Sequence, residues 1–353
     1  MRTIQVNASK SYKVKIGTNI LSEVTDVLSE GQNVAIVTDE TVALLHLEKL
    51  KNTLAQAGFK AEVFMFPSGE ESKCIQVLSC LLEWLAEIPL TRSDILIAFG
   101  GGVTGDLAGF AASIYLRGIE FIQVPTTLLA AIDSSVGGKT GIDLQAGKNL
   151  AGSFWQPKEV VCDLALLDTL SEETFAEGSA EAIKAAILVD NEMFEMIRKG
   201  KIKEELEEII YRCVSMKRNL VEEDEFDTGA RQLLNLGHTF GHCVEKLSNF
   251  EITHGNAVAI GLALIMEAAA AYGHCTKADK DAVIEALHAN GLYIDCPYKA
   301  DEMLEVMQRD KKRKGDNLTL ILPRKIGECF LQTMTLEEAK RYLEIGLQGG
   351  IHE

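Results

Sequence analysis

The sequence predicts an α/β protein in two parts: an N-terminal domain with a parallel, Rossmann-like sheet over residues 1–165 and a mostly α-helical domain over residues 166–353. Short apolar runs alternate with helical stretches in the first half, whereas long helical periodicities fill the second. A chain of 353 residues is also long enough for two hydrophobic cores. We expect the active site in a cleft between the two domains.

Four runs in the first half have the character of buried parallel strands, because they are apolar on both faces and end near Asp, Gly or Thr. They are VAIVTD (34–39), DILIAFGGG (94–102), EFIQVPTT (120–127) and EVVCD (159–163). The segment 133–157 is long, polar and weakly periodic, so we expect a functional loop there, with a mobile solvated loop as the alternative.

The second half carries helical periodicity over most of its length. It predicts helices over 171–198, 201–222, 229–248, 255–272, 277–290 and 335–346, and a single strand over 317–323. The apolar run 257–273 is interrupted by Glu267 and is short for a bilayer span, so we expect a buried helix and no membrane partner.

Composition excludes some classes of protein. The net charge of −17 weighs against a nucleic-acid partner, because binding a phosphate backbone requires a basic surface. The N-terminus lacks the apolar core of a signal peptide, and the eight cysteines show no CxxC spacing. We therefore expect a cytoplasmic protein with reduced thiols.

The segment FGGGVTGD (99–106) follows a strand and opens a helix. Its glycines satisfy G-x-G-x-x-G, which lets the backbone approach a pyrophosphate at a helix N-terminus. An ordinary Rossmann domain carries this loop at its first βα turn, so we expect a dinucleotide in a different α/β arrangement, with Asp39 at the ribose hydroxyls. A glycine turn without a ligand is the alternative.

The segment LNLGHTFGH (234–242) places His238 and His242 on one face of a helix. Zinc proteases place a Glu directly after the first His, where this chain has Thr239. From the spacing alone, the two histidines are candidate joint zinc ligands, with a carboxylate and a water completing the site. The alternative is that both are hydrogen-bonded core histidines. A third histidine nearby, His254, argues against this alternative.

Eight motifs occur in order along the chain: GGGVTGDLAGF, RG at 117–118, VPTTLLA, DSSVGGKTGI, GKN, AEAIK, LNLGHTFGH and HGNAVAIG. Together they resemble the 3-dehydroquinate synthases of the sugar-phosphate cyclase superfamily, over about residues 30–325. The resemblance implies a carbon–oxygen lyase of the shikimate pathway, which leads to chorismate and the aromatic amino acids. Its substrate would be a phosphorylated sugar acid, 3-deoxy-D-arabino-heptulosonate 7-phosphate (DAHP), and its products 3-dehydroquinate and phosphate.

The resemblance also implies the cofactors and the course of the reaction. NAD and a divalent metal, usually zinc with cobalt as the alternative, would assist oxidation at C5. Elimination of phosphate, reduction, ring opening and aldol closure would follow, and the substrate's own phosphate would take the C6 proton.

The resemblance assigns site residues motif by motif. The metal ligands would be Glu181, His238 and His254, and His242 would instead serve proton transfer at the substrate. The NAD positions would be Asp39, Gly69, Glu70, Lys73, Gly102, Val103, Thr104, Gly105, Asp106, Thr126, Thr127, Lys139, Lys148, Leu166, Leu167, Asp168 and Thr169. The substrate positions would be Asp133, Lys139, Asn149, Lys184, Lys217, Arg231, Asn235 and Lys311, and Arg117 would reach the neighbouring subunit of a homodimer.

Three positions depart from the family pattern. Asn256 stands where Glu is usual, so a carboxylate beside His254 is expected to be missing. Asp143 replaces the usual Asn, and Asp227 stands where Glu is common.

Three other functions are alternatives to a 3-dehydroquinate synthase. They are another sugar-phosphate cyclase, a metal-dependent NAD alcohol dehydrogenase and a non-catalytic NAD sensor.

Overall fold

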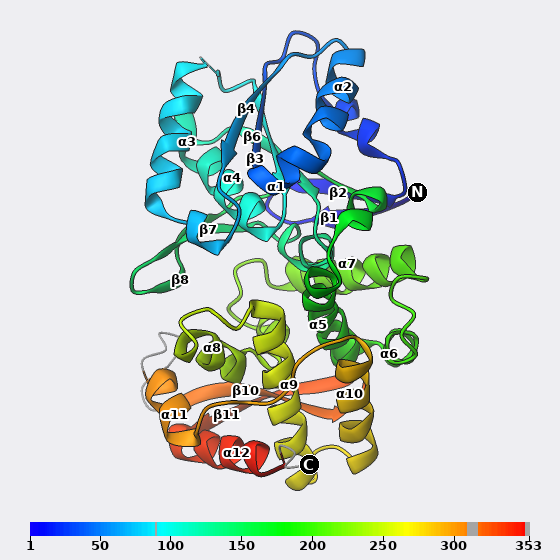
Figure 1. Ribbon diagram of the computed structural model, residues 1–353, viewed down its shortest axis with the longest axis vertical. Coiled ribbons are helices and arrows are strands. Elements are labelled where there is room, and N and C mark those ends of the chain that lie inside the picture. Colours follow the sequence, from blue (N-terminus) through cyan, green and yellow to red (C-terminus); the bar gives the residue numbers. More distant parts are fainter. Residues whose placement is uncertain (89, 309–316, 350–353) are drawn as a thin grey trace. The chain divides into compact units, whose positions relative to one another are not determined.

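The computed structural model describes residues 1–88, 90–308 and 317–349, and the chain divides into two compact units. The first unit comprises Met1–Ser171 with Lys217–Phe226, and the second comprises Glu172–Met216 with Asp227–Glu353. Figure 1 gives the element labels used below.

The first unit is built on a sheet of seven strands in the order β1-β2-β9-β6-β5-β3-β4. The strands are β1 (Arg2–Asn7), β2 (Ser11–Gly17), β3 (Val34–Asp39), β4 (Ala61–Phe66), β5 (Ile95–Gly100), β6 (Glu120–Pro125) and β9 (Glu159–Asp163). All neighbours pair in parallel except β1 and β2, which are antiparallel. The predicted parallel, Rossmann-like sheet is confirmed.

Helices cover both faces of this sheet, and Figure 1 shows α3 and α4 on one side and α2 on the other. The helices are α1 (Glu40–Val42), α2 (Glu48–Gln56), α3 (Ile75–Glu87) and α4 (Gly102–Ile114). In β3, Ala35 and Val37 pack with α3 and α4, whereas Val34 and Ile36 pack with α2. Burial of both faces explains why the strands are continuous apolar runs.

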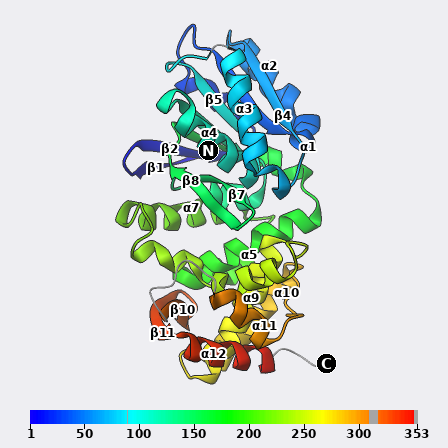
Figure 2. The ribbon, with the colours of Figure 1, turned by 90° about the vertical axis from the view of Figure 1, so that its left-hand side faces the viewer.

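The second unit is mostly helical, as predicted, and surrounds a central helix, α9 (Figures 1 and 2). Its helices are α5 (Glu172–Val189), α6 (Asn191–Arg198), the first part of α7 (Leu206–Glu223), α8 (His238–Leu247), α9 (His254–Ala271), α10 (Lys277–Ala289), α11 (Ala300–Gln308) and α12 (Leu336–Gly349). An antiparallel pair, β10 (Asn317–Lys325) and β11 (Glu328–Thr335), completes the unit, so the expectation of a single strand in this half was wrong.

Helix α9 is long and apolar enough to cross a membrane, with a mean hydropathy of 1.4, but 72% of it is buried. It contacts α5, α8, α10 and α12. This is the environment of a core helix, as the sequence predicted for this run.

Several predicted elements are corrected. The expected loop at 133–157 contains an antiparallel hairpin, β7 (Lys139–Leu144) and β8 (Gly147–Phe154), seen in Figure 2. The helix expected over 229–248 begins at His238, because Gly237 adopts a left-handed conformation with φ of 77° that interrupts it. The helix expected over 171–198 is two helices, since Asp190 ends α5 and caps α6 through Met193 N–H.

Candidate active site

The glycine loop lies at the point of the sheet where the chain order reverses. Strand β3 has β4 on one side and β5 on the other, so the crevice at the ends of β3 and β5 is where doubly wound sheets bind ligands. Asp39 ends β3, and helix α4 starts at Gly102 just after β5. The Thr104 hydroxyl lies 3.4 Å from the Asp39 carboxylate, so the structure brings these two predicted NAD positions together.

Further predicted cofactor positions follow the ends of β6 and β9. Thr126 and Thr127 come directly after β6, and the Thr126 hydroxyl is buried without a hydrogen-bond partner among the described residues. Residues Leu166, Leu167, Asp168 and Thr169 belong to a 3₁₀ turn after β9, where the Thr169 hydroxyl lies 2.9 Å from Nε2 of His46. A buried, unsatisfied hydroxyl at a strand end fits a ligand group that would hydrogen-bond to it.

Lys73 is the centre of a buried charged group in the same unit. Its ammonium lies 2.7 Å from the Asp106 carboxylate, 2.7 Å from Oδ1 of Asn149 and 3.9 Å from Glu70. Burial opposes its charge, but Asp106 and Glu70 outweigh burial and raise the pKa of Lys73 to about 12. Burial raises the pKa of Asp106 in spite of Lys73. Lys148 also faces Glu70, at 3.8 Å.

Two predicted substrate positions meet where α7 enters the first unit. The Lys217 ammonium lies 2.8 Å from the Asp133 carboxylate and 2.5 Å from the Asp133 carbonyl oxygen. Lys139 is exposed at the start of β7, and Asn149 has a left-handed φ of 53° in β8, where its N–H donates to Asp143. The hairpin thus positions residues that the sequence placed in a loop.

In the second unit, three predicted metal ligands from three helices converge. Oε1 of Glu181 (α5) lies 3.3 Å from Nε2 of His238 (α8) and 3.4 Å from Nε2 of His254 (α9). The ligand atoms of this group lie within 4.8 Å of one another. Both Glu181 oxygens are buried and accept no hydrogen bond from the described residues, although Oε2 forms an ion pair with the Lys184 ammonium. A metal ion would satisfy a buried acceptor of this kind.

The charges around Glu181 keep it ionised. Burial alone would raise its pKa, but the Lys184 ammonium, which forms an ion pair with it, and His238 hold the pKa well below its usual range. Burial lowers the pKa of His238. Burial also opposes the charge of His254, but its contacts with Glu181 and Glu245 outweigh burial and raise its pKa to about 10. Metals bind an ionised carboxylate and neutral imidazoles, so a metal ion would replace a proton on His254.

His242 lies beside this group without belonging to it. Its ring centroid is 5.3 Å from that of His238 and 6.4 Å from that of His254, and its side chain is 42% exposed. It belongs instead to a second group, with Glu245 and His254. The structure therefore separates the two histidines that spacing alone made joint ligands.

Glu245 is a residue that the sequence interpretation missed. Its carboxylate is 2% exposed and Oε1 lies 3.3 Å from Nδ1 of His254. The carboxylate expected to be missing beside His254 is thus supplied by α8, while Asn256 bonds to Thr253 and to the N–H of Tyr293. Glu245 lies seven residues after His238, two turns along the same helical face, and that spacing was the available signal.

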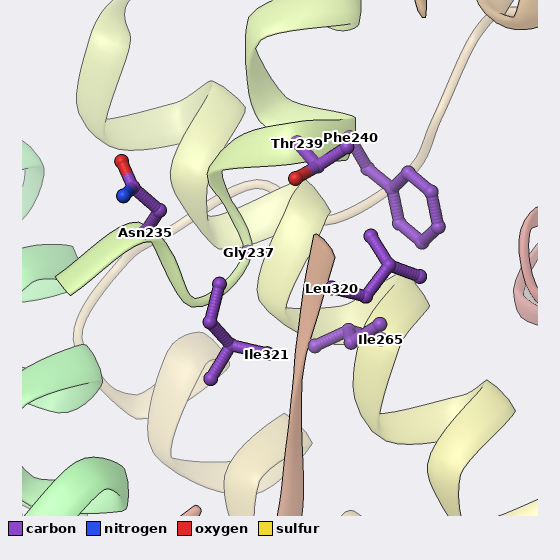
Figure 3. A pocket seen from close by; sticks show the side chains of 7 residues that line it. All are labelled: Asn235, Gly237, Thr239, Phe240, Ile265, Leu320 and Ile321. Carbon is purple, nitrogen blue, oxygen red and sulfur yellow. The ribbon is translucent and has the colours of Figure 1, made fainter. Parts of the chain in front are cut away.

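The remaining predicted residues of the second unit surround the turn before α8. Arg231 is 1% exposed and the Asn235 amide donates to the Gln232 carbonyl at 3.1 Å. A cavity of about 10 Å³ behind this turn is lined by Asn235, Gly237, Thr239, Phe240, Ile265, Leu320 and Ile321 (Figure 3). It has room for about one water, so it is too small to bind a substrate. Its small size shows that the turn packs closely against Ile265, Leu320 and Ile321.

Two predicted residues stand apart. Lys311 lies outside the described residues. Arg117 is exposed in the first unit, and both Leu116 and Arg117 adopt left-handed φ values, of 49° and 67°. Two consecutive residues of this kind are strained, and such strain concentrates at functional sites.

Family models match residues 63–313, and a relative matches nearly the whole chain. The model described as "3-dehydroquinate synthase N-terminal" matches residues 63–177, and the one described as "3-dehydroquinate synthase C-terminal" matches residues 178–313. A 3-dehydroquinate synthase of Clostridium botulinum (strain Alaska E43 / Type E3) is 42% identical over 337 residues, covering 93% of this chain and 96% of that protein.

Solved structures of related cyclases share the fold. A 2-deoxy-scyllo-inosose synthase complexed with carbaglucose-6-phosphate, NAD⁺ and Co²⁺ is 26% identical with a TM-score of 0.88, covering 99% of this chain and 100% of that one. A 2-epi-5-epi-valiolone synthase from Streptomyces hygroscopicus subsp. jinggangensis 5008, with NAD⁺ and Zn²⁺ bound, is 26% identical with a TM-score of 0.89, covering 99% of each chain. The family models, the relatives and the ordered motifs agree, and the chain belongs to the 3-dehydroquinate synthase family.

Proposed function

We propose that the chain converts DAHP into 3-dehydroquinate and phosphate, with NAD as a recycled cofactor and zinc as the metal. The family assignment supports the reaction. The observation that carries the metal site is the approach of Nε2 of His238 and of His254 to one oxygen of Glu181. Two imidazoles and one carboxylate form a ligand set that zinc favours in catalytic sites, where a further position stays open.

The first unit supports the choice of cofactor. The glycine loop at the N-terminus of α4 and the crevice between β3 and β5 suit a pyrophosphate and its ribose. The two related cyclase structures contain NAD⁺, one with Co²⁺ and one with Zn²⁺. When bound, NAD accepts and returns a hydride, and the metal polarises the oxygen of the carbon that is oxidised.

The chain's own residues bind the substrate and move its protons. Lys184, 3% exposed beside Glu181, would offset the negative charge that develops near the metal ligands. Lys139, Lys217 and Arg231 supply cations for the carboxylate and phosphate of the substrate. His242, half exposed next to His238, is placed to exchange protons with the substrate.

The assigned roles of the two histidines on α8 are tested by paired variants. We expect His238→Ala to lose its metal and its activity, because a ligand is removed. We expect His242→Ala to keep its metal and to lose about 10²–10⁴-fold in kcat, the usual contribution of a proton-transfer group. Metal content measured by atomic absorption beside the kinetics decides: equal metal loss in both variants would make His242 a ligand.

The choice of substrate separates this proposal from other cyclases. We expect the purified protein to release phosphate from DAHP and to form a carbocyclic product detectable by mass spectrometry. Glucose 6-phosphate serves as the comparison, because the ligand of the inosose synthase structure is its carba analogue. Turnover of glucose 6-phosphate without turnover of DAHP would assign the chain to a different cyclase activity.

We further propose that the enzyme is a cytoplasmic homodimer in which Arg117 reaches the neighbouring subunit's site. The strained, exposed backbone at Leu116 and Arg117 supports a role beyond folding for this turn. The Nε–H of Arg92 donates to the Leu116 carbonyl at 3.1 Å and so holds the turn.

A further inference from the structure

Glu245 lies directly behind one of the proposed metal ligands. It projects from α8, is 2% exposed, and its Oε1 lies 3.3 Å from Nδ1 of His254. We propose that Glu245 is a positioning residue of the metal site, which accepts the Nδ1–H of His254 and thereby presents the Nε2 lone pair to the metal. The inference rests on the metal site of the proposed function and adds a residue to it.

The other histidine of the site supports this reading by its own arrangement. Nδ1 of His238 lies 3.1 Å from the Leu236 carbonyl oxygen, and Nε2 faces Glu181. Both imidazoles thus have an oxygen acceptor at Nδ1 and direct Nε2 to the same Glu181 oxygen. A hydrogen bond at one ring nitrogen fixes the tautomer and leaves the other nitrogen to bind the metal.

The two acceptors differ in charge, and this gives Glu245 a second effect. The Leu236 carbonyl is neutral, whereas a carboxylate increases the basicity of the imidazole it contacts. The site would also hold a divalent cation beside the buried Lys184 ammonium. A buried carboxylate close to His254 offsets part of that positive charge, and uncompensated charge in a buried site is costly.

A second cation site is the competing interpretation, because Glu245 also approaches His242. Its Oε2 lies 3.9 Å from Nε2 of His242, and the group His242, Glu245 and His254 has ligand-type atoms within 4.8 Å of one another. A metal there would have to share the His254 ring with the first metal and displace its contact with Glu245. The number of metal ions per chain therefore separates the two interpretations.

The test compares Glu245→Gln with Glu251→Gln, an exposed carboxylate six residues further along the chain. Zn²⁺ and Co²⁺ affinities are measured by competition with a chelator, and the visible absorption of bound Co²⁺ reports the ligand environment. We expect one ion per chain in the wild type, about 10–100-fold weaker binding in Glu245→Gln with an altered Co²⁺ spectrum, and no change in Glu251→Gln.

A conservative variant distinguishes loss of the positioning role from a folding defect. Glu245→Asp keeps the charge on a shorter side chain, so we expect its metal affinity to lie between those of the wild type and Glu245→Gln, with a native circular dichroism spectrum. Wild-type affinity and an unchanged Co²⁺ spectrum in Glu245→Gln would overturn the inference. So would two ions per wild-type chain with one lost in Glu245→Gln.

The His238→Ala variant separates failure of this inference from failure of the proposed metal site. If His238→Ala binds metal as tightly as the wild type, the proposed site itself is wrong. If His238→Ala loses the metal while Glu245→Gln retains wild-type affinity, only the positioning role of Glu245 is wrong.

Discussion

The role that we propose for each histidine depends on single atoms, namely on the partner of its second ring nitrogen. His238 and His254 have Nδ1 at an oxygen acceptor and Nε2 near Glu181. His242, one turn after His238, instead has its Nε2 3.9 Å from Glu245. Two histidines on one helical face can therefore have different chemistry.

A buried carboxylate remote from these residues gives a stability prediction at the same scale. Asp94 is 3% exposed, and its oxygens accept from the N–H of Asn33 at 2.7 Å and of Thr91 at 2.6 Å. We expect Asp94→Asn to lower the free energy of unfolding by about 1–3 kcal/mol at pH 7, because hydrogen bonds to a charged group are lost. Urea unfolding measures the difference, with the exposed Asp295→Asn as the control.

The pH dependence of that difference follows from the direction of the pKa shift. Burial opposes ionisation of Asp94, but the hydrogen bonds from Thr91 and Asn33 lower its pKa below the usual value. A lowered folded-state pKa contributes stability that is present above the unfolded-state pKa and is lost as the pH falls through the folded-state pKa. The wild-type and Asp94→Asn curves should converge below about pH 4, and a constant difference there would contradict this account.

At the scale of elements, the proposed metal ligands His238 and His254 meet because α8 and α9 approach closely. A Cβ added to Gly261 of α9 would lie 2.0 Å from the carbonyl oxygen of Gly237, the residue before His238. The close contact requires a residue without a side chain, and it fixes the turn that orients His238. The same turn explains why α8 begins at His238.

A substitution at this contact tests its importance. We expect Gly261→Ala to push the His238 turn away from α9, with a loss of about 1–3 kcal/mol in stability from overpacking and a clear loss of metal affinity. Gly346→Ala is the matched control, because its Cβ would meet the Leu264 carbonyl at 2.6 Å, between α12 and α9. Equal metal affinity in the two variants would show that the contact serves packing only.

Prediction from the sequence was accurate where local pattern determines structure. The apolar runs at 34–39 and 159–163 are strands, and the run at 120–127 is a strand as far as Pro125, since a buried parallel strand has a continuous apolar pattern. The hairpin at 139–154 was missed because glycines and polar residues interrupt the alternation of apolar and polar side chains in it. The strands at 2–7 and 61–66 were missed because their polar residues resemble loop composition.

The site was less predictable than the fold, because its contacts are long-range. Spacing placed His238 and His242 on one face, but only the position of His254 on another helix shows which of them faces Glu181. The ordered motifs provided that information through resemblance. Glu245 was overlooked because a Glu near the end of an amphipathic helix is usually solvent-exposed, whereas this one is buried against His254.

At the scale of the whole molecule, the proposed homodimer makes a specific prediction about mixed subunits. If Arg117 acts in the neighbouring site, an Arg117→Ala subunit keeps its own metal ligands and can receive Arg117 from a His238→Ala partner. We expect two inactive variants, unfolded and refolded together, to regain part of the wild-type activity. Mixtures that stay inactive although mixed dimers form would place Arg117 in its own subunit's site.

Net charge is also a property of the whole molecule, and the chain carries −17 although its proposed substrate is an anion. Cations such as Lys184, 3% exposed, and Arg231, 1% exposed, are held inside the protein rather than spread over its surface. Local cations of this kind bind carboxylate and phosphate groups without a basic surface. The acidic composition is therefore compatible with a polyanionic substrate.

In the proposed reaction, NAD is used and regenerated within each turnover. The direct measurement incubates the purified protein with DAHP, zinc and a trace of NAD, and follows phosphate and the 340-nm absorbance of NADH together. We expect phosphate to form in large molar excess over the NAD supplied, with no accumulation of NADH. NADH formed in proportion to substrate, without release of phosphate, would contradict this expectation and identify a dehydrogenase.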